Sequence, residues 1–329
     1  MVSTAKPRVL LVTNMFPVPR DPTRGVFVAR QTRAVSQLLS VPVEVVVVGR
    51  TGAGNILQSR DAVRERVRVF APDLVHVYYG LSGAALPFRT RLPVLVTLCG
   101  SDLLRWHVAH DAWGFVEFAT STVTAHRARR IVVQSTVVRN ALPFQALRSK
   151  TRVLATGIDL DQFCPLDRAV CRAGLNWPSE TPVVLFGADP DRAVKQFWLA
   201  RAACDRVVRD HNLPVRLECL SRVRPEDVPR YINAADCVVI TSRWEAGPIV
   251  LSEALACGVP VVTVPVGYAL DEQVGDSYLY VTAPEPRALA ERLAAVIRQP
   301  PPHVRPVTRV FPTQAEYARS LLELYVETP

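Results

Sequence analysis

The sequence predicts an α/β protein built from two doubly wound, mostly parallel sheets in series. Two observations lead to this fold class. Short apolar runs that end in Gly, Ser or a polar loop alternate with segments of helical periodicity. This pattern lapses once, at 153–167, where Gly, Asp and Pro gather, and then restarts. The length of 329 residues is sufficient for two domains of ordinary size.

Each half supplies its own series of strands and helices. The strands expected in the first half are RVLLVTNMF, VEVVVVG, DLVHVYYG, PVLVTLCG and RIVVQS, with a helix over GVFVARQTRAVSQLLS. The second half is expected to follow the order TPVVLFGADP (strand), AVKQFWLARAACDRVVRDH (helix), PVRLECLS (strand), PEDVPRYINAA (helix), DCVVITS (strand), PIVLSEALACG (helix) and PVVTVPVG (strand).

The expected domains are 1–156 and 157–302, each of them Rossmann-like. The remaining 303–329 is expected to form a connector and a terminal crossover helix. RQPPPHVRP is rich in proline, as connectors often are. TQAEYARSLLELY is an amphipathic helix with a threonine N-cap and Glu316 three residues later, a capping-box pattern. We expect this helix to pack back toward the first domain.

Composition indicates a cytoplasmic globular protein. The seven cysteines are scattered and odd in number, which favours reduced thiols. The first residues lack the apolar core of a signal peptide, and no run approaches eighteen apolar residues.

Charge is divided unevenly between the two halves. Residues 1–156 hold 21 basic and 8 acidic residues, a net +13, whereas 157–329 hold 18 and 22, a net −4; together these give the +9 of the whole chain. Such an asymmetry fits either an anionic partner of the first half or simply an arginine-rich surface. Nucleic acid is disfavoured because no reader motif is present. A phosphorylated or lipid-linked substrate, or peripheral contact with the inner face of a membrane, remains.

Two glutamates eight residues apart stand out in the stretch TSRWEAGPIVLSEALACGVPVV. DCVVITS reads as a buried strand, so Glu245 lies in the loop at its carboxyl end. Pro248 suits the start of the next helix, which places Glu253 about one and a half turns into that helix. Carboxylates and free helix N–H groups together could bind a ligand with hydroxyls and a phosphate. The alternative is that both glutamates are ordinary solvated charges.

The stretch RWEAGPIVLSEALACGVPVV resembles the Glu-x7-Glu signature of retaining, nucleotide-sugar-dependent glycosyltransferases of family four, which have the GT-B fold. Further stretches resemble the same family in the expected order. They are PTRGVFVARQTRAV, VTLCGSDLL, TGIDLDQFCPLDR, VVLFGADPDRAVKQFWLARAA, VRPEDVPRYINAADCVVITSRWE and YARSLLELY.

The resemblance implies that 1–156 binds the acceptor and that 157–302 binds the nucleotide sugar. It also implies roles by position, in a cleft between the two domains. Glu245 would hold hydroxyls of the donor sugar, and Glu253 the ribose. Arg192 and Lys195 would face the diphosphate. The expected catalytic residues are Glu245, Lys195, Arg192 and Asp102, and the expected donor-binding residues are Glu253, Gly25, Ala246, Gly247, Pro248, Ile249 and Val250. Ala246 departs from the glycine usual in the family, and its methyl group could narrow the sugar pocket.

Lys195 also has a physical argument of its own. A departing nucleoside diphosphate gains negative charge, and a fixed cation beside it stabilises the transition state more than the ground state. Lys195 is the single lysine after residue 156, in a chain that otherwise uses arginine. The competing interpretation is a solvated lysine that is there by chance.

No metal or other cofactor is expected. Asp-x-Asp at 189–191 and at 159–161 fits the letters of a divalent-metal motif. Two-letter motifs are common, however, and Arg192 and Lys195 already supply positive charge.

The first half gives fewer assignments. The family often has a histidine near the reacting carbon where this chain has Cys99. Asp102 is either an acceptor-side base or orienting group, or the N-cap of the helix in SDLLRW. His76 is as readily a packed strand residue as a ligand contact, and a histidine pair, His107 and His110, is a weak metal signal. GRTGAG (49–54) has the wrong glycine order for a dinucleotide fingerprint.

The residues and the resemblance together predict a metal-independent glycosyltransferase, and the resemblance implies that it retains the anomeric configuration. It would move a hexose or N-acetylhexosamine from a nucleoside diphosphate sugar, with UDP-sugars favoured, to a hydroxyl acceptor. The product would belong to glycoconjugate, cell-surface polysaccharide or natural-product biosynthesis. The alternatives are a sugar-nucleotide epimerase of the same architecture and a non-catalytic nucleotide-sugar-binding subunit.

Overall fold

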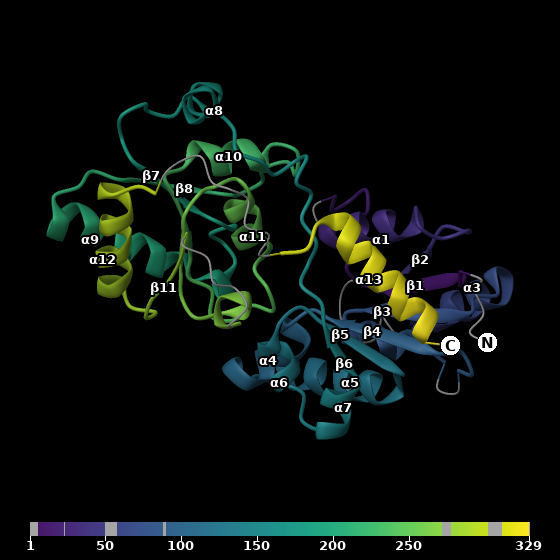
Figure 1. Cartoon of the computed structure of the whole chain (residues 1–329). Helices are drawn as coiled ribbons and strands as arrows, with labels where there is room; N and C mark the ends of the chain where they lie inside the picture. The colour runs from purple at the N-terminus through teal and green to yellow at the C-terminus, as the bar shows by residue number, and fades with distance from the viewer. Residues whose placement is uncertain are drawn as a thin grey trace. The chain divides into compact units, whose positions relative to one another are not determined.

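The computed structural model describes residues 6–22, 24–49, 58–87, 90–271, 278–301 and 311–328. The chain divides into two compact units (Figure 1). Unit 1 comprises Met1–Gly157 and Pro312–Pro329, and unit 2 comprises Ile158–Phe311. Each unit contains one parallel sheet with helices packed on it, so the predicted α/β class with two Rossmann-like sheets is confirmed.

The sheet of unit 1 has the strand order β2-β1-β3-β4-β5-β6 within the described residues. Every pair is parallel. The strands are β1 (Val9–Thr13), β2 (Glu44–Val47), β3 (Leu74–Tyr78), β4 (Val94–Leu98), β5 (Arg130–Val133) and β6 (Thr151–Val153). All residues of β1, β3 and β4 are buried, as expected for central strands that are covered on both faces. The short edge strand β6 was not among the predicted strands.

Helices connect these strands in the order that a doubly wound sheet requires. They are α1 (Val26–Ser36), α3 (Arg60–Phe70), η1 (Gly80–Ala85), α4 (Ser101–Ala109), α5 (Ala112–Arg127), α6 (Thr136–Asn140), α7 (Gln145–Ser149) and α13 (Gln314–Glu327).

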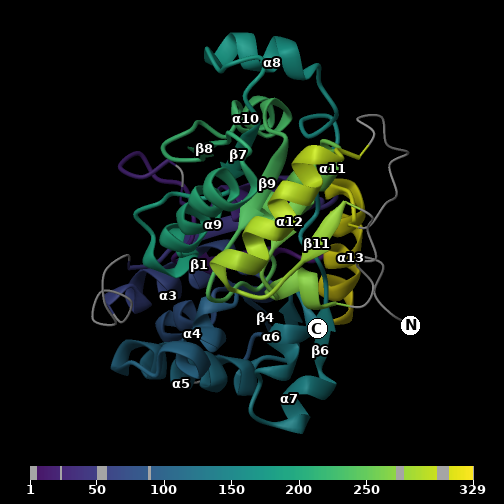
Figure 2. The ribbon, with the colours of Figure 1, turned by 90° about the vertical axis from the view of Figure 1, so that its left-hand side faces the viewer.

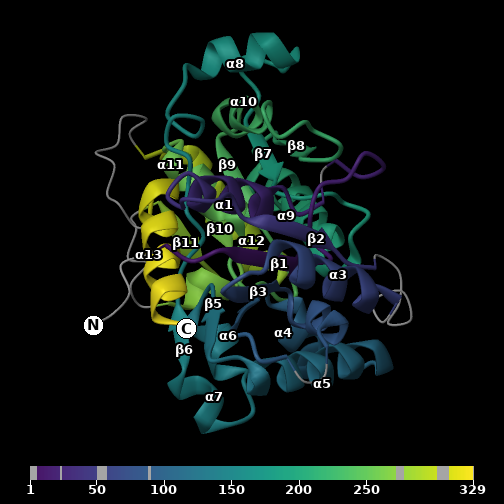
Figure 3. The same cartoon turned by 90° about the vertical axis from the view of Figure 1, so that its right-hand side faces the viewer.

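The terminal helix α13 belongs to unit 1, as the sequence predicted. It packs against α1 (Figures 1 and 3) and shares a buried core with β1, β3 and β4. Its predicted capping box is present: the Thr313 side chain accepts from the Glu316 N–H, and the Glu316 carboxylate accepts from the Thr313 N–H. Tyr325 of α13 also hydrogen-bonds the buried His76.

The sheet of unit 2 has the order β11-β10-β9-β7-β8 within the described residues, again with parallel pairs. Helices α9 and α12 lie side by side in this unit (Figure 2). The strands are β7 (Val183–Phe186), β8 (Arg216–Cys219), β9 (Cys237–Ile240), β10 (Val261–Thr263) and β11 (Leu279–Val281). The helices are α8 (Arg168–Leu175), η2 (Ala193–Lys195), α9 (Phe197–His211), α10 (Val228–Ala234), α11 (Ile249–Ala256), η3 (Gly267–Leu270) and α12 (Pro286–Arg298).

One predicted helix is wrong at its start. The periodicity from Ala193 to His211 predicted a continuous helix, but Gln196 adopts the left-handed conformation, with φ 50° and ψ 52°. The segment is therefore split into the 3-10 turn η2 and the helix α9, and Lys195 lies in the turn.

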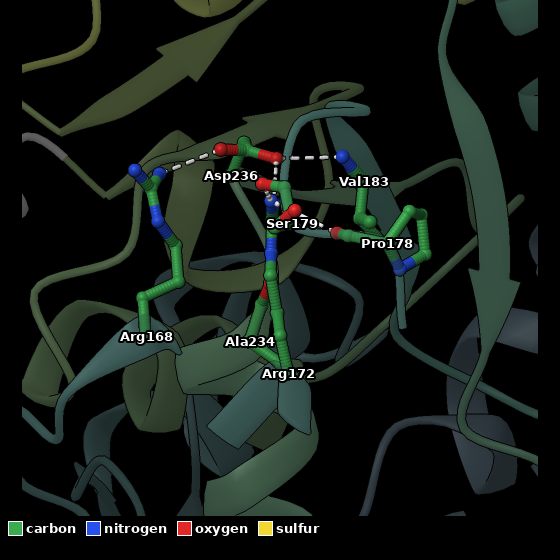
Figure 4. A network of polar contacts seen from close by, with 7 residues as sticks. All are labelled: Arg168, Arg172, Pro178, Ser179, Val183, Ala234 and Asp236. Carbon is green, nitrogen blue, oxygen red and sulfur yellow. Dashed lines mark hydrogen bonds and ion pairs between the residues drawn. The ribbon is translucent and has the colours of Figure 1, made fainter. Parts of the chain in front are cut away.

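A buried ion pair fastens α8 to the amino end of the unit 2 sheet (Figure 4). Arg172, whose side chain is 6% exposed, pairs with Asp236, the residue just before β9. Its guanidinium also donates to the carbonyl oxygens of Ala234, at 2.9 Å, and Ser179, at 2.6 Å. Asp236 in turn accepts from the Val183 N–H at 2.6 Å. Each of the two buried charges is thus also hydrogen-bonded to other protein groups.

Two other predictions concern parts of the chain that are described only partly. The proline-rich connector at 298–306 and the glycine motif at 49–54 lie largely outside the described residues. All seven cysteines are described, and each is a free thiol. Among the described residues, no helix combines the length and hydropathy needed to cross a membrane.

Candidate donor site at the carboxyl edge of the unit 2 sheet

The loops after β7 and β9 carry the predicted donor-site residues of unit 2. Ligands of open parallel sheets bind at the carboxyl ends of the strands, because loops and helix N-termini converge there. β7 and β9 are direct neighbours in the sheet, so the loops that follow them lie next to each other. Arg192 and Lys195 follow β7, and Glu245 follows β9.

Lys195 and Glu245 form an ion pair between these two loops. The Lys195 ammonium donates to Oε1 of Glu245. The Ser242 hydroxyl donates to the same oxygen at 2.7 Å. The side chains of the pair are 15% and 16% exposed, so both are largely withdrawn from water but still accessible. The structure thus brings together two residues that are fifty positions apart in the chain.

The interruption at Gln196 is what places Lys195 beside Glu245. The Thr241 hydroxyl, at the end of β9, lies 2.9 Å from the carbonyl oxygen of Lys195 and 3.0 Å from that of Gln196. The Arg243 N–H donates to the Val194 carbonyl at 2.8 Å. These bonds attach the η2 turn to the loop that carries Glu245.

The ammonium of Lys195 has more donors than protein partners. A lysine ammonium carries three N–H donors. Within the described part of the chain, its hydrogen-bond partner is Glu245 alone. Arg192, three residues earlier, is exposed, and its guanidinium forms no hydrogen bond or ion pair with a side chain of the described residues. Two cations therefore stand at this edge with donors to spare, which suits an anionic ligand.

The segment between Glu245 and α11 is closely packed. A Cβ atom on Gly247 would lie 2.0 Å from the ring of the buried Tyr268, so this position requires glycine. Ala246 is also buried, and Pro248 is the N-cap of α11 rather than its first residue. A Cβ atom on Gly187, just after β7, would lie 2.8 Å from Val250. The first turn of α11 therefore approaches the β7 loop closely.

The start of α11 offers hydrogen-bond donors at the same edge. Ile249 and Val250 are its first two residues, and N–H groups at such positions have no partner within the helix. Glu253 is half-buried in the next turn of α11. The roles of all these residues toward a sugar nucleotide stay predictions.

The unit 1 residues of the predicted site have clear structural settings. Gly25 is the N-cap of α1 with φ 63°, and a Cβ atom there would lie 2.4 Å from the Met15 backbone. Cys99 is half-buried against an apolar cluster that includes Leu11 and Tyr78. Burial raises the pKa of the Cys99 thiol well above its usual range, so the thiol stays protonated at neutral pH.

Asp102 is completely buried in the first turn of α4. Its Oδ2 atom accepts from the N–H groups of Gly80 and Cys99, each at 3.0 Å. The alternative prediction of a helix N-cap is wrong, because Gly100 occupies that position. Burial raises the pKa of the Asp102 carboxyl, against the opposing effect of these backbone hydrogen bonds. The setting favours an orienting group over an acceptor-side base.

Three histidines of unit 1 have protein contacts that account for their positions without a ligand. His76 is buried between the Thr97 hydroxyl and the Tyr325 hydroxyl, at 2.8 Å from each. It is thus a packed strand residue. His107 lies edge-to-face against Phe118, and His110 lies edge-to-face against Trp106.

No metal site emerges in the described ranges. They contain no group of three or more His, Cys, Asp or Glu side chains arranged to hold an ion. Asp189 and Asp159, each the first residue of an Asp-x-Asp motif, accept the N–H two residues later through their side chains. The expectation of a metal-independent enzyme stays a prediction.

Four residues that shape this site were missed in the sequence. Thr241 and Ser242 position Lys195 and Glu245, and Gly187 and Tyr268 allow and fix the approach of α11. The available signals were two hydroxyl residues directly after a buried strand, in VVITS, and a glycine directly after another, in VVLFG.

Both halves of the chain match models of glycosyltransferase families. Residues 9–162 match the model described as Glycosyltransferase Family 4, and residues 202–309 match Glycosyl transferases group 1. The chain is thus related in both halves to glycosyltransferases, and its two Rossmann-like units are those of the GT-B fold.

Among curated proteins, the similar ones include two D-inositol 3-phosphate glycosyltransferases. The protein of Saccharomonospora viridis is 29% identical over 271 residues, which cover 69% of this chain and 62% of that protein. One of Catenulispora acidiphila is 27% identical over 269 residues, which cover 69% and 64%. This chain therefore spans less than two thirds of the length of these relatives.

Solved structures of similar fold cover almost the whole chain. Sucrose-phosphate synthase from Thermosynechococcus elongatus has a TM-score of 0.69 at 17% identity and covers 97% of this chain and 95% of its own. Anabaena HepE in complex with UDP-glucose has a TM-score of 0.65 at 19% identity, with the same two coverages. At these identities the likeness concerns the fold alone.

Proposed function

We propose that this protein is a retaining glycosyltransferase. It transfers a hexose or N-acetylhexosamine from a nucleoside diphosphate sugar to a hydroxyl acceptor. The observation that carries the proposal is the Lys195–Glu245 pair at the carboxyl edge of the unit 2 sheet, with unmatched N–H donors on Lys195. The exposed Arg192 beside it and the relation of both halves to glycosyltransferases support the same conclusion.

The proposed chemistry needs fixed positive charge at the leaving group. When the bond between the sugar and the diphosphate breaks, the diphosphate gains negative charge. Lys195 and Arg192 then stabilise the transition state more than the ground state, because the charge they face has grown. Glu245 holds Lys195 in place before the donor arrives. When the donor is bound, Glu245 accepts hydrogen bonds from hydroxyls of the donor sugar.

Retention of configuration fits front-side attack. The acceptor hydroxyl approaches on the face from which the diphosphate leaves, its oxygen bonds to the anomeric carbon, and its proton passes to an oxygen of the departing diphosphate. Protein groups supply position and charge rather than a nucleophile. Glu253 binds the ribose, and the N–H groups of Ile249 and Val250 bind the phosphates together with Gly25.

The proposed donor is a UDP-sugar, and the proposed acceptor is anionic. HepE, which has the same fold, was solved in complex with UDP-glucose, and the curated relatives are named for an inositol phosphate. The net +13 of residues 1–156 suits a phosphorylated or lipid-linked acceptor. We place the enzyme in the cytoplasm, with peripheral contact to the inner face of the membrane through unit 1.

A panel of UDP-, GDP- and dTDP-sugars in a thermal-shift assay tests the donor. The expected result is a rise in the unfolding midpoint with one UDP-sugar, followed by acceptor-dependent release of UDP. Isomerised donor without an acceptor would indicate an epimerase instead. Donor binding with no release under any acceptor would indicate a non-catalytic subunit.

Two further assays test the proposed partners. Activity that survives EDTA is expected, whereas activity lost in EDTA and restored by Mn²⁺ would contradict metal independence. Binding to vesicles that contain anionic lipid is expected to weaken as salt rises. Absent or salt-insensitive binding would contradict the membrane contact.

A further inference from the structure

A buried polar cluster in unit 1 is separate from the donor chemistry of unit 2. It surrounds Tyr79 and Gly80, the two residues that follow β3. Tyr79 has φ 71° and ψ 113°, a backbone conformation that L side chains rarely adopt. Strain of this kind persists only where the surrounding contacts over-determine it, and it is concentrated at functional sites.

The side chain of Tyr79 joins three elements of unit 1. Its hydroxyl donates to Oε1 of Glu117 on α5 at 2.6 Å and accepts from the Ser101 hydroxyl at the start of α4 at 3.3 Å. Its backbone N–H donates to the Thr97 carbonyl of β4 at 2.9 Å. The end of β3 is thereby tied to the end of β4 and to both following helices.

Asp102 completes the connection from the other side. One of its carboxylate oxygens accepts from Gly80, after β3, and from Cys99, after β4, both at 3.0 Å. A Cβ atom on Gly80 would lie 2.4 Å from the Ser121 hydroxyl, so α5 closes over this residue. The loops after two neighbouring strands are thus fastened to a single buried oxygen.

The cluster is costly to bury. Asp102 is fully buried and Glu117 is 6% exposed, and burial raises the pKa of both carboxyls. The second oxygen of Asp102 has no hydrogen-bond partner, and the second oxygen of Glu117 lies 3.8 Å from the Arg105 guanidinium. Buried polar groups that lack some of their hydrogen bonds destabilise the folded state relative to apolar side chains at the same place. Their retention therefore points to a task beyond packing.

We propose that Tyr79, Asp102 and Glu117 are positioning residues for the acceptor. They hold the turn formed by Cys99, Gly100 and Ser101 in the conformation that receives the acceptor hydroxyl at the carboxyl edge of the unit 1 sheet. The inference rests on the proposed transferase function, which defines the acceptor. An exact turn geometry matters, because a misplacement of about 1 Å can lower the rate about a hundredfold.

The test compares Tyr79→Phe, which removes only the hydroxyl, with Glu117→Gln, whose amide oxygen can still accept from Tyr79. The matched control is Tyr325→Phe, because Tyr325 is also a buried tyrosine of unit 1 but hydrogen-bonds His76 instead of the turn. Acceptor kinetics, donor affinity and alkylation of Cys99 by a thiol reagent are measured, the last by peptide mass spectrometry. Half-buried Cys219 in unit 2 is the internal reference for alkylation.

For Tyr79→Phe we expect a higher acceptor KM, with kcat/KM for the acceptor about ten- to a hundredfold lower. Donor affinity stays unchanged. Alkylation of Cys99 becomes several-fold faster, while that of Cys219 does not change. Glu117→Gln retains most of the wild-type values, and Tyr325→Phe retains them in every readout.

Three results would overturn the inference. Unchanged alkylation of Cys99 in Tyr79→Phe would mean that the hydroxyl does not hold the turn. Faster alkylation with wild-type acceptor kinetics would remove the role in acceptor binding. Equal losses in Tyr325→Phe would indicate general loosening of unit 1. Failure of the proposed function is recognised separately: the wild-type protein itself would transfer no sugar, and the acceptor role would fall with it, whereas the alkylation assay would still report on the turn.

Discussion

Two ion pairs lie at opposite edges of the unit 2 sheet, and their surroundings differ. At the amino edge, Arg172 is 6% exposed and donates to three backbone carbonyls in addition to Asp236. At the carboxyl edge, Lys195 is 15% exposed, and in the described residues its ammonium contacts Glu245 alone. Arg168 adds a second cation to Asp236 at 2.6 Å. In the first pair, other protein groups take up the remaining hydrogen bonds of the cation, whereas in the second pair the cation keeps donors without a protein partner.

The difference distinguishes structural from functional charge. A buried ion pair is tolerated when protein hydrogen bonds replace those of water, and it then fixes the chain that supplies them. A cation that keeps spare donors near the surface can give them to a ligand. We therefore expect substitutions in the first pair to change stability, and substitutions at the carboxyl edge to change binding and turnover.

The largest stability effect is expected for Arg172→Met. The change removes the buried cation of Asp236 and the donor to three backbone carbonyls, so the free energy of unfolding should fall by about 3–5 kcal/mol in urea denaturation. The matched control is Arg168→Ala, since the Arg168 side chain is 36% exposed, and its cost should be below about 1 kcal/mol. A stable Arg172→Met protein that has lost turnover would reverse the assignment of the two pairs.

Next in size is the loss of donor affinity in Glu253→Ala. Loss of charge-assisted hydrogen bonds to the ribose should raise the dissociation constant of the donor about ten- to a hundredfold, measured by isothermal titration calorimetry. The free energy of unfolding should hardly change. Glu291→Ala, which removes a surface partner of Arg287 on α12, is the control and should bind donor normally. Wild-type affinity in Glu253→Ala would contradict the ribose assignment.

The smallest of these effects is the pH dependence of stability caused by His76, a buried side chain that is neutral in the folded protein. Both ring nitrogens of His76 have protein partners, and burial lowers its pKa from 6.5 to about 3. The unfolded chain takes up a proton as the pH falls through 6.5, but the folded chain does not until about pH 3. Stability is therefore lost on acidification, by about 2 kcal/mol between pH 7 and pH 5.

Urea denaturation at the two pH values measures this effect. His76→Gln removes the titrating group and should lack this part of the acid-induced loss. If His76→Gln lost as much stability as the wild type, another group would be responsible.

Much of the fold could be predicted because its signals are local. β1, β7 and β9 are short apolar runs that end in polar residues. The capping box of α13 is a pattern of four consecutive residues. Edge strands such as β6 and β11 are too short for a reliable pattern. Their pairing depends on the neighbouring strand rather than on their own residues.

The candidate site was predictable in its residues but not in its contacts. The rule that ligands meet strand ends placed Lys195 and Glu245 at one edge, but a continuous helix would have oriented Lys195 differently. The break at Gln196 is held by Thr241, 45 residues further along the chain. In the same way, the sequence left Asp102 open between an acceptor-side group and a helix cap, because its partner Gly80 is 22 positions away in the chain. Such side-chain-to-backbone contacts over long separations leave no local pattern.

The account is tested most directly by the turnover of Lys195→Ala with the donor that the thermal-shift panel identifies. The unmatched donors of Lys195 are proposed to meet the departing diphosphate, so kcat should fall by about 10²- to 10³-fold. Because the Ser242 hydroxyl still donates to Glu245 and the Glu245 carboxylate still reaches water, the unfolding midpoint should stay close to the wild-type value. Full turnover in Lys195→Ala would contradict the account, as would a loss of turnover that merely follows a loss of stability.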